Sequence, residues 1–170
     1  MTPGASGLAP VLVLGWGNPS RGDDALGPEF ITRASALPAP PGAPAVEWLT
    51  DFQLQVEHAL DLVGRSHVLF VDASVACEPP FQVEPLRSAA NHALTSHAMA
   101  PQAVMQVFER IHGHAPPPCS LLAIRAQAFA LGTGLGPQAQ AHLEQALAWF
   151  GQWWAGLGET PATTRMADHA

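Results

Sequence analysis

The chain has 170 residues, of which 48% are hydrophobic and 12% are charged, and its formal net charge is −7. This length and apolar content predict one globular domain with a single substantial core and exclude an intrinsically disordered chain. Its seven basic residues are scattered rather than clustered, which argues against nucleic acid as a partner.

The first apolar run of the chain is too short to be a membrane span. Leu8 to Trp16 has about half the length that a spanning helix needs, and no basic segment precedes it. Cys77 and Cys119 are too few for a disulfide framework, so we expect both to be ordinary reduced thiols. These features predict a cytoplasmic protein with neither a secretory signal nor a membrane segment.

The first half of the chain alternates strand and helix patterns. Val11–Leu14 is a continuous apolar run that ends in glycines, as is typical of a central parallel strand. Helical spacing follows over residues 24–36, and a second strand is predicted at Val46–Leu49. Residues 53–62 then predict a short helix, and His67–Val71 predicts a third strand.

The second half continues the alternation. It predicts a short edge strand at Phe81–Pro85, a helix from Pro101 to Ile111, a strand at Ser120–Ile124 and a last helix from Pro137 to about Trp154. Strands and helices that alternate in this way indicate an α/β domain of three layers, with helices on both faces of a parallel or mixed sheet.

The predicted helices and strands fall within one domain. We expect this domain to span residues 9–157, with flexible termini at residues 1–8 and 158–170, where apolar residues are few.

Three candidate functional residues follow or precede these elements on one side of the sheet. Asp24 lies in the loop after the first strand, Asp72 directly after the third, and His97 ahead of the helix at Pro101. Two carboxylates and an imidazole suit nickel, zinc, cobalt or non-haem iron. Their separations match no local metal motif, so a resident metal and a metal delivered by a partner both stay open.

The structural interpretation of the two adjacent aspartates is helix capping. Asp23 can be explained in this way, because a carboxylate near a helix start accepts free backbone amides. One aspartate then remains to point elsewhere, and this makes Asp24 the candidate for chemistry.

Two other classes of site were considered. Gly15-Trp-Gly17 after a first strand suggests a dinucleotide loop, but Ser20 replaces the third glycine and acidic residues stand where phosphate would bind. Ser74 lacks a Gly-x-Ser-x-Gly elbow, and nothing local supports Cys77 with His97 as a thiol protease. Both alternatives are therefore disfavoured.

Three blocks in order resemble the nickel-iron hydrogenase maturation endopeptidases. They are residues 11–27 (VLVLGWGNPSRGDDALG), Leu69-Phe-Val-Asp-Ala73 and Thr95-Ser-His-Ala-Met-Ala-Pro101. Residues 121–125 and 129–135 are similar to the last strand of the family and the approach to its final helix. Residues 51–61 most resemble the branch that serves NAD-reducing, bidirectional hydrogenases. The resemblance covers roughly residues 10–155.

The resemblance implies a twisted, mostly parallel sheet of five strands and a single proteolytic activity. The enzyme would remove the C-terminal extension of a hydrogenase large subunit precursor after nickel insertion. Asp24, Asp72 and His97 match the positions that contact the metal in the family, and Asp51 is a possible further site residue. We expect nickel to come with the precursor rather than to be held permanently, and the free enzyme to be a monomer.

An alternative function from another class is a non-catalytic, nickel-sensing chaperone or binding module for the large subunit. Retention of all three ligand positions favours the enzyme. Two departures from the family pattern lie elsewhere: Gln127 stands where this branch often has Glu, and Ala100 stands where a Ser cap is common.

Overall fold

The computed structural model describes residues 7–89 and 99–159. Five strands form one sheet: β1 (Val11–Trp16), β2 (Val46–Asp51), β3 (His67–Ser74), β4 (Phe81–Leu86) and β5 (Cys119–Arg125). The α-helices are α1 (Leu26–Ser35), α2 (Pro101–His112) and α3 (Pro137–Leu157), and the 3-10 helices are η1 (Gly22–Ala25) and η2 (Val56–Leu62). The predicted α/β fold is confirmed.

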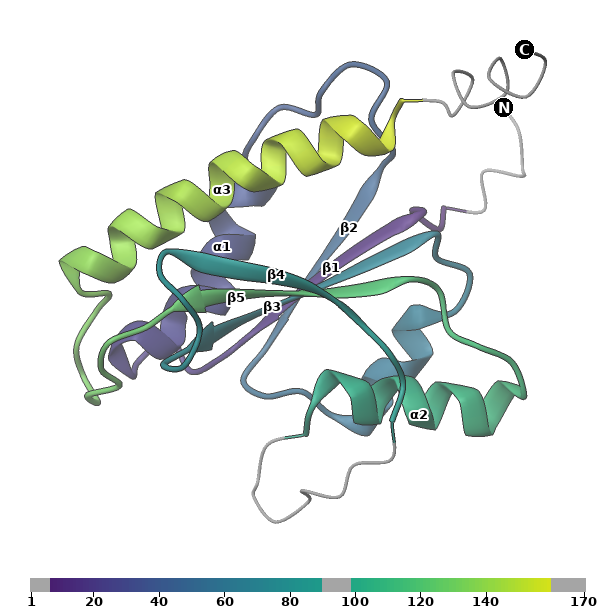
Figure 1. The fold of residues 1–170 in the computed structure, drawn as a ribbon, viewed down its shortest axis with the longest axis horizontal. Coiled ribbons are helices and arrows are strands. Elements are labelled where there is room, and N and C mark those ends of the chain that lie inside the picture. The colour runs from purple at the N-terminus through teal and green to yellow at the C-terminus, as the bar shows by residue number, and fades with distance from the viewer. Residues whose placement is uncertain (1–6, 90–98, 160–170) are drawn as a thin grey trace.

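The sheet is mostly parallel, and its strand order is β2-β1-β3-β5-β4. All neighbouring pairs are parallel except β4 with β5. The chain leaves β1 towards β2 on one side, and β3 and β5 lie on the other side (Figure 1). The carboxyl ends of β1 and β3 therefore flank a topological switch point, the place where open α/β sheets bind their ligands.

Helices cover both faces of the sheet, which gives the three predicted layers (Figure 1). One core cluster joins α1 and α3 to the sheet through residues such as Val13, Phe30 and Phe150. A second cluster on the opposite face joins η2 and α2 to it through residues such as Leu14, Leu62 and Phe108. Neighbouring residues of β1 thus alternate between two buried surfaces, which explains its continuous apolar run.

The tryptophans of α3 belong mainly to the core, as helical spacing predicts. Trp154 is buried, and its indole N–H donates to the carbonyl of Pro44 over 2.8 Å. Trp149 and Trp153 stack on each other and are partly buried against the first core cluster. None of the helices within the described ranges combines the length and hydrophobicity that a bilayer crossing requires.

The free edge of the sheet at β4 is short and mostly exposed. The amide of Arg125 donates to the carbonyl of Pro80, and the antiparallel register pairs Pro85 with Ser120. Residues of such a pair alternate between facing the partner strand and facing away from it. Pro85 therefore stands at a position where a backbone N–H would point away from β5, and proline has no backbone N–H.

Most boundaries differ from the sequence prediction by one to three residues, and three of the differences concern the candidate site. The helix predicted from Asp24 begins as the 3-10 turn η1 and becomes α-helical only at Leu26. The helix predicted over residues 53–62 is the 3-10 helix η2. β3 continues beyond Val71 to Ser74 because its last residues still pair with β5, so Asp72 lies within the strand. The termini predicted to be flexible lie largely outside the described residues, and that prediction is untested.

Glycines let the start of α1 approach the end of β1 unusually closely. A Cβ atom on Gly15 would lie 2.5 Å from the carbonyl oxygen of Gly27, and a Cβ atom on Gly27 would lie 2.3 Å from that of Trp16. Both neighbours are backbone atoms, so they could yield only if the helix moved. The glycines of the first block therefore serve helix–strand packing, and this packing fixes where η1 stands.

We expect Gly15→Ala to lower the free energy of unfolding by about 1–3 kcal/mol, because the added methyl group overpacks the contact between β1 and α1. Urea unfolding would measure the change. The matched control is Gly151→Ala in α3, where an added Cβ meets nothing within 4 Å. There alanine should stabilise the helix by about 0.5–1 kcal/mol. Equal effects of the two substitutions would contradict this account of Gly15.

Candidate active site

The loop after β1 holds Asp24 at the carboxyl edge of the sheet. Gly17 has a φ of 146°, and a Cβ there would lie 2.0 Å from the carbonyl oxygen of Asp24. The loop therefore folds back on itself at a position that only glycine fills easily. Asp24 is fixed there, because its Oδ2 accepts the amide N–H of Asn18 over 2.7 Å. Among the described residues, no hydrogen bond engages its Oδ1.

Asp23 is a structural residue, although it does not cap its own helix as the sequence suggested. It is 3% exposed, and its Oδ2 accepts the amides of Gln127 and Ala128 while its Oδ1 accepts that of Gly136. The starts of η1 and α1 have no side-chain cap. Asp23 instead ties the first loop to the loop between β5 and α3, a contact between distant segments that no local pattern encodes.

Asp72 lies on β3 and faces the side of the sheet that carries α2, because Val68 and Phe70 on the same strand belong to that core cluster. Burial raises the pKa of the Asp72 carboxyl from 3.8 to about 7. The hydrogen bond that its Oδ1 accepts from the Ala73 amide opposes this rise, and the negative charge of Asp24 adds to it. The fold thus brings the two predicted carboxylates within range of each other.

The third predicted residue, His97, lies outside the described residues, so its position is untested. Within those residues, no group of three or more His, Cys, Asp and Glu side chains is placed to hold a metal ion. The end of α2 leads to the start of β5, so α2 runs against the strands and begins towards the carboxyl edge (Figure 1). In the sequence, His97 precedes Pro101, the first residue of α2, by four positions.

Asp51, predicted as a possible site residue, ends β2 and lies against the buried ring of His58. Its Oδ2 lies 3.2 Å from Nε2 of His58, and its Oδ1 accepts the amide N–H of Phe52 over 2.6 Å. Its carbonyl oxygen accepts the amide of Gly17, which links β2 to the first loop. Sequence reasoning missed His58, and the only local signal was the Asp-x₆-His spacing, which matches no known motif.

The nucleophiles considered from sequence have structural roles here. Ser74 Oγ accepts the amides of Ala76 and Cys77 and so closes the turn after β3. Cys77 is a buried free thiol, and its Sγ contacts the carbonyl of Ala123 at 3.5 Å. Cys119 is also a free thiol, and burial raises its pKa to about 12. Both cysteines are thus buried and unpaired.

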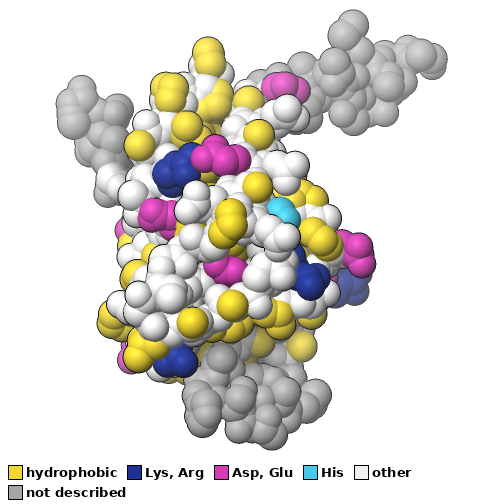
Figure 2. Space-filling model, turned by 90° about the vertical axis from the view of Figure 1, so that its left-hand side faces the viewer, with side chains coloured by type: hydrophobic (Ala, Val, Ile, Leu, Met, Phe, Trp, Pro, Cys, Tyr) yellow, Lys and Arg dark blue, Asp and Glu magenta, His cyan; other side chains and the backbone are white. Residues whose placement is uncertain are grey.

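The face around this site is mixed in character. Figure 2 views the molecule from the side towards which β3 and β5 point, and hydrophobic side chains are spread over that face with separate acidic and basic side chains among them. Phe52, Val75 and Leu131 are exposed apolar residues in the loops that follow β2, β3 and β5. Two carboxylates at a switch point, surrounded by apolar loops, suit a cationic centre presented on a protein partner.

The structure is similar to solved hydrogenase maturation proteases. HycI of Thermococcus kodakarensis KOD1 matches with a TM-score of 0.63 and 18% identity, over 87% of this chain and 94% of that one. The maturating endopeptidase HybD of Escherichia coli matches with a TM-score of 0.60 and 25% identity, over 82% and 88%. An endopeptidase of Escherichia coli solved in solution matches with a TM-score of 0.61 and 26% identity, over 82% of this chain and 88% of that one.

No family model and no curated protein matches the sequence. The solved neighbours show that the chain has the fold of the nickel-iron hydrogenase maturation proteases, and the chain spans most of the length of each neighbour. These neighbours support the enzyme class that the sequence blocks indicate, an endopeptidase of hydrogenase maturation.

The two adjacent aspartates should differ sharply in their effect on stability. Asp23→Asn leaves one acceptor oxygen for three amides and turns an NH₂ group towards at least one of them. We expect a loss of about 2 kcal/mol in the free energy of unfolding, as for hydrogen bonds to a charged group. Asp24→Asn keeps one oxygen for its single amide partner and should cost less than about 1 kcal/mol. Chemical denaturation of both variants would measure this difference, and equal losses would contradict it.

Asp72 should make the protein less stable as the pH rises. Its folded-state pKa of about 7 lies above its ordinary value of 3.8, so between these values the folded state binds the proton more tightly. Stability is lost progressively over this range and stays reduced above it. Asp72→Asn removes the effect, so the variant should match the wild type near pH 3.5 and exceed it at pH 8 by about 1–3 kcal/mol.

Thermal melts of both proteins in the presence of a chelator, from pH 3.5 to 8, would measure this difference. A difference in stability that is independent of pH would contradict the burial of an ionisable carboxyl at this position.

Proposed function

We propose that this protein is the endopeptidase that removes the C-terminal extension of a nickel-loaded hydrogenase large subunit precursor. The observation that carries the proposal is the pair Asp24 and Asp72. Segments 48 residues apart in the sequence place these carboxylates close enough for the charge of one to raise the pKa of the other. They lie at the switch point of a fold shared with hydrogenase maturation endopeptidases.

Each carboxylate is held in an orientation that suits the binding of a cation. Asp24 uses Oδ2 and Asp72 uses Oδ1 to accept one backbone amide, which fixes the orientation of both groups. Within the described residues, the second oxygen of each has no hydrogen-bond partner. A divalent ion between them would relieve both the cost of burying Asp72 and its repulsion from Asp24. The donor set therefore fits the metal that the family resemblance implies.

In this proposal nickel is part of the substrate. Asp24 and Asp72 contact the nickel of the precursor, and His97 is the third protein ligand. Nickel bound in this way would polarise a carbonyl group or orient the extension near the scissile bond. The contribution of the protein is to hold two fixed carboxylates at the place where the metal-loaded precursor docks, so that an empty precursor lacks the cation that pairs with them.

The similarity of residues 51–61 to one branch of the family supports a narrower proposal. We infer that the client is an NAD-reducing, bidirectional hydrogenase and that the enzyme works in the cytoplasm as a monomer. The Asp51–His58 pair lies within this segment and links it physically to the first loop. A non-catalytic, nickel-sensing chaperone on the same scaffold is the alternative, and a cleavage assay separates the two.

The test is mass spectrometry of a large subunit precursor incubated with this protein, with and without nickel loading. We expect one C-terminal fragment to be lost, and only from the nickel-loaded sample. Asp24→Asn should lower the cleavage rate by at least about a hundredfold while leaving the fold intact, because it removes one charge that faces the cation.

The matched control is Glu78→Gln, which removes an exposed negative charge from the segment after β3 and should cleave normally. Complex formation without cleavage would favour the chaperone, and normal processing by a folded Asp24→Asn variant would exclude Asp24 from the site.

A further inference from the structure

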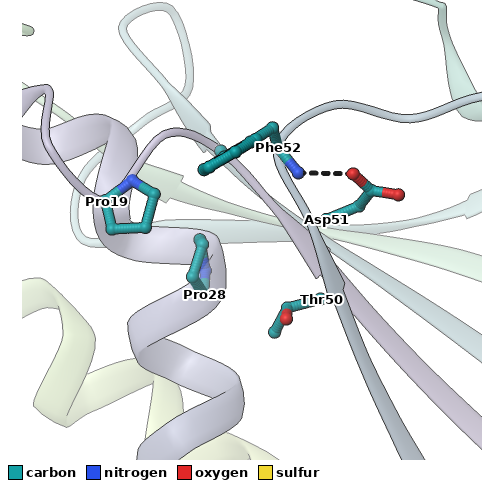
Figure 3. Close-up of a pocket in the computed structure, with 6 residues that line it drawn as sticks. Pro19, Pro28, Thr50, Asp51 and Phe52 are labelled. Atoms are coloured by element: carbon teal, nitrogen blue, oxygen red, sulfur yellow. Dashed lines mark hydrogen bonds between the residues drawn. The ribbon is translucent and has the colours of Figure 1, made fainter.

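A small apolar pocket lies beside the first loop, at the carboxyl ends of β1 and β2. Its volume is about 240 Å³, and it is lined by Gly17, Pro19, Pro28, Thr50, Asp51 and Phe52. Figure 3 shows two prolines, a threonine and a phenylalanine around the hollow, whereas the carboxylate of Asp51 points away from it. The pocket is smaller than those of drug-sized ligands and has the size and character to receive one apolar side chain.

Phe52 is the wall of this pocket whose exposure to water is most unfavourable in free energy. Its side chain is 70% exposed, although it follows directly on a strand of the sheet. One exposed apolar residue is ordinary on a protein surface. Phe52 differs because it stands over a hollow whose other walls are Pro19 and Pro28, so a side chain inserted there would cover three apolar surfaces at once.

A chain of polar contacts fixes the position of Phe52. The Gln55 amide donates to Nδ1 of His58 over 2.9 Å, so the ring proton lies on Nε2, the nitrogen that is 3.2 Å from Oδ2 of Asp51. The other oxygen of Asp51 accepts the Phe52 amide. The His58 ring is buried, and a reciprocal capping box with Gln55 holds it. His58 thus orients Asp51, and Asp51 orients the backbone that carries the Phe52 wall.

The pocket and the acidic site share the first loop. Gly17 lines the pocket, and its Cα packs against the backbone of Asp24. Asn18 donates its amide to the Asp24 carboxylate, and the next residue, Pro19, is a wall of the pocket. One short loop therefore carries the proposed nickel contact on one side and the apolar pocket on the other.

We propose that this pocket is a subsite for one apolar side chain of the hydrogenase precursor, near its cleaved extension, and that His58 is a positioning residue that keeps the Phe52 wall in place. The proposal rests on the function proposed above and adds the chemistry that selects the substrate. The carboxylates respond to the nickel centre, whereas the pocket recognises the polypeptide that presents it.

The first test compares Phe52→Ala with Ile111→Ala, which removes an apolar residue of similar exposure from α2. Both side chains are more than half exposed, so both variants should fold. Phe52→Ala should raise KM for the nickel-loaded precursor about tenfold, with kcat changed by less than about twofold, because contacts to the substrate are lost without loss of chemistry. Ile111→Ala should change neither parameter. Equal KM values for the two variants would overturn the subsite.

The second test identifies the occupant. Apolar residues on both sides of the cleaved bond are replaced singly by Ser in the precursor, and each is assayed with the wild type and with Phe52→Ala. One position should raise KM with the wild type and have almost no further effect with the variant, because the two changes remove the same contact. Additive effects at every position would overturn the proposal that a side chain enters this pocket.

The third test separates positioning from general structural support. Gln at position 58 can still donate an N–H to Asp51, whereas Leu cannot. His58→Leu should raise KM like Phe52→Ala and add nothing to it in the double variant, while His58→Gln should stay within about threefold of the wild type. If the Leu variant does not fold, His58→Asn, whose amide is too short to reach Asp51, replaces it. A fall in kcat with unchanged KM would overturn the positioning role.

The two proposals fail in distinguishable ways. If the wild type cleaves the precursor but Phe52→Ala behaves like Ile111→Ala, only the subsite is wrong. If the precursor binds without cleavage, the dissociation constants of the same variants decide the subsite while the protease proposal falls. If the nickel-loaded precursor neither binds nor is cleaved, both proposals fall.

Discussion

The close approach of α1 to β1 is the constraint on which the site depends. Gly15 and Gly27 remove the side chains that would separate the two elements, and Gly17 lets the intervening loop fold back against Asp24. Three features follow from this one contact: the start of α1 reaches the switch point, the charge of Asp24 comes close enough to raise the pKa of Asp72, and Pro19 and Pro28 come together as walls of the pocket. The glycines that resemble a nucleotide-binding loop therefore serve helix–strand packing. The anionic groups at this loop are carboxylates of the protein itself.

The acidic residues of this edge differ in how strongly the fold engages them. Asp23 is buried and engaged by three amides, so its charge is consumed in joining the first loop to the loop before α3. Asp24 and Asp72 are each engaged by one amide and disfavour each other. The protein thus tolerates an unfavourable pair at one place, which is the usual sign that local stability has been given up for function.

The layers and the strands could be predicted from the sequence because they depend on local pattern, whereas the three site positions remain predictions. Val11 and its neighbours are apolar on both faces, which defines a central strand, and the motif blocks mark Asp24 and Asp72. Strand order and the antiparallel placement of β4 depend on contacts between distant segments, which periodicity does not carry. For the same reason the partners of Asp23 and the pairing of His58 with Asp51 were not foreseen. The branch suggested by residues 51–61 and the role of His97 remain predictions.

The edge strand β4 has a consequence for how the protein behaves in a crowded solution. A bare strand edge invites strands of other chains to join it, and this is a common beginning of aggregation. Here the register turns Pro85 outward, so the edge lacks one of the donors that a joining strand would need, and the adjacent Glu84 adds an exposed charge. The lateral border of the sheet therefore resists self-assembly, although the loops at its carboxyl edge expose apolar residues such as Phe52, Val75 and Leu131.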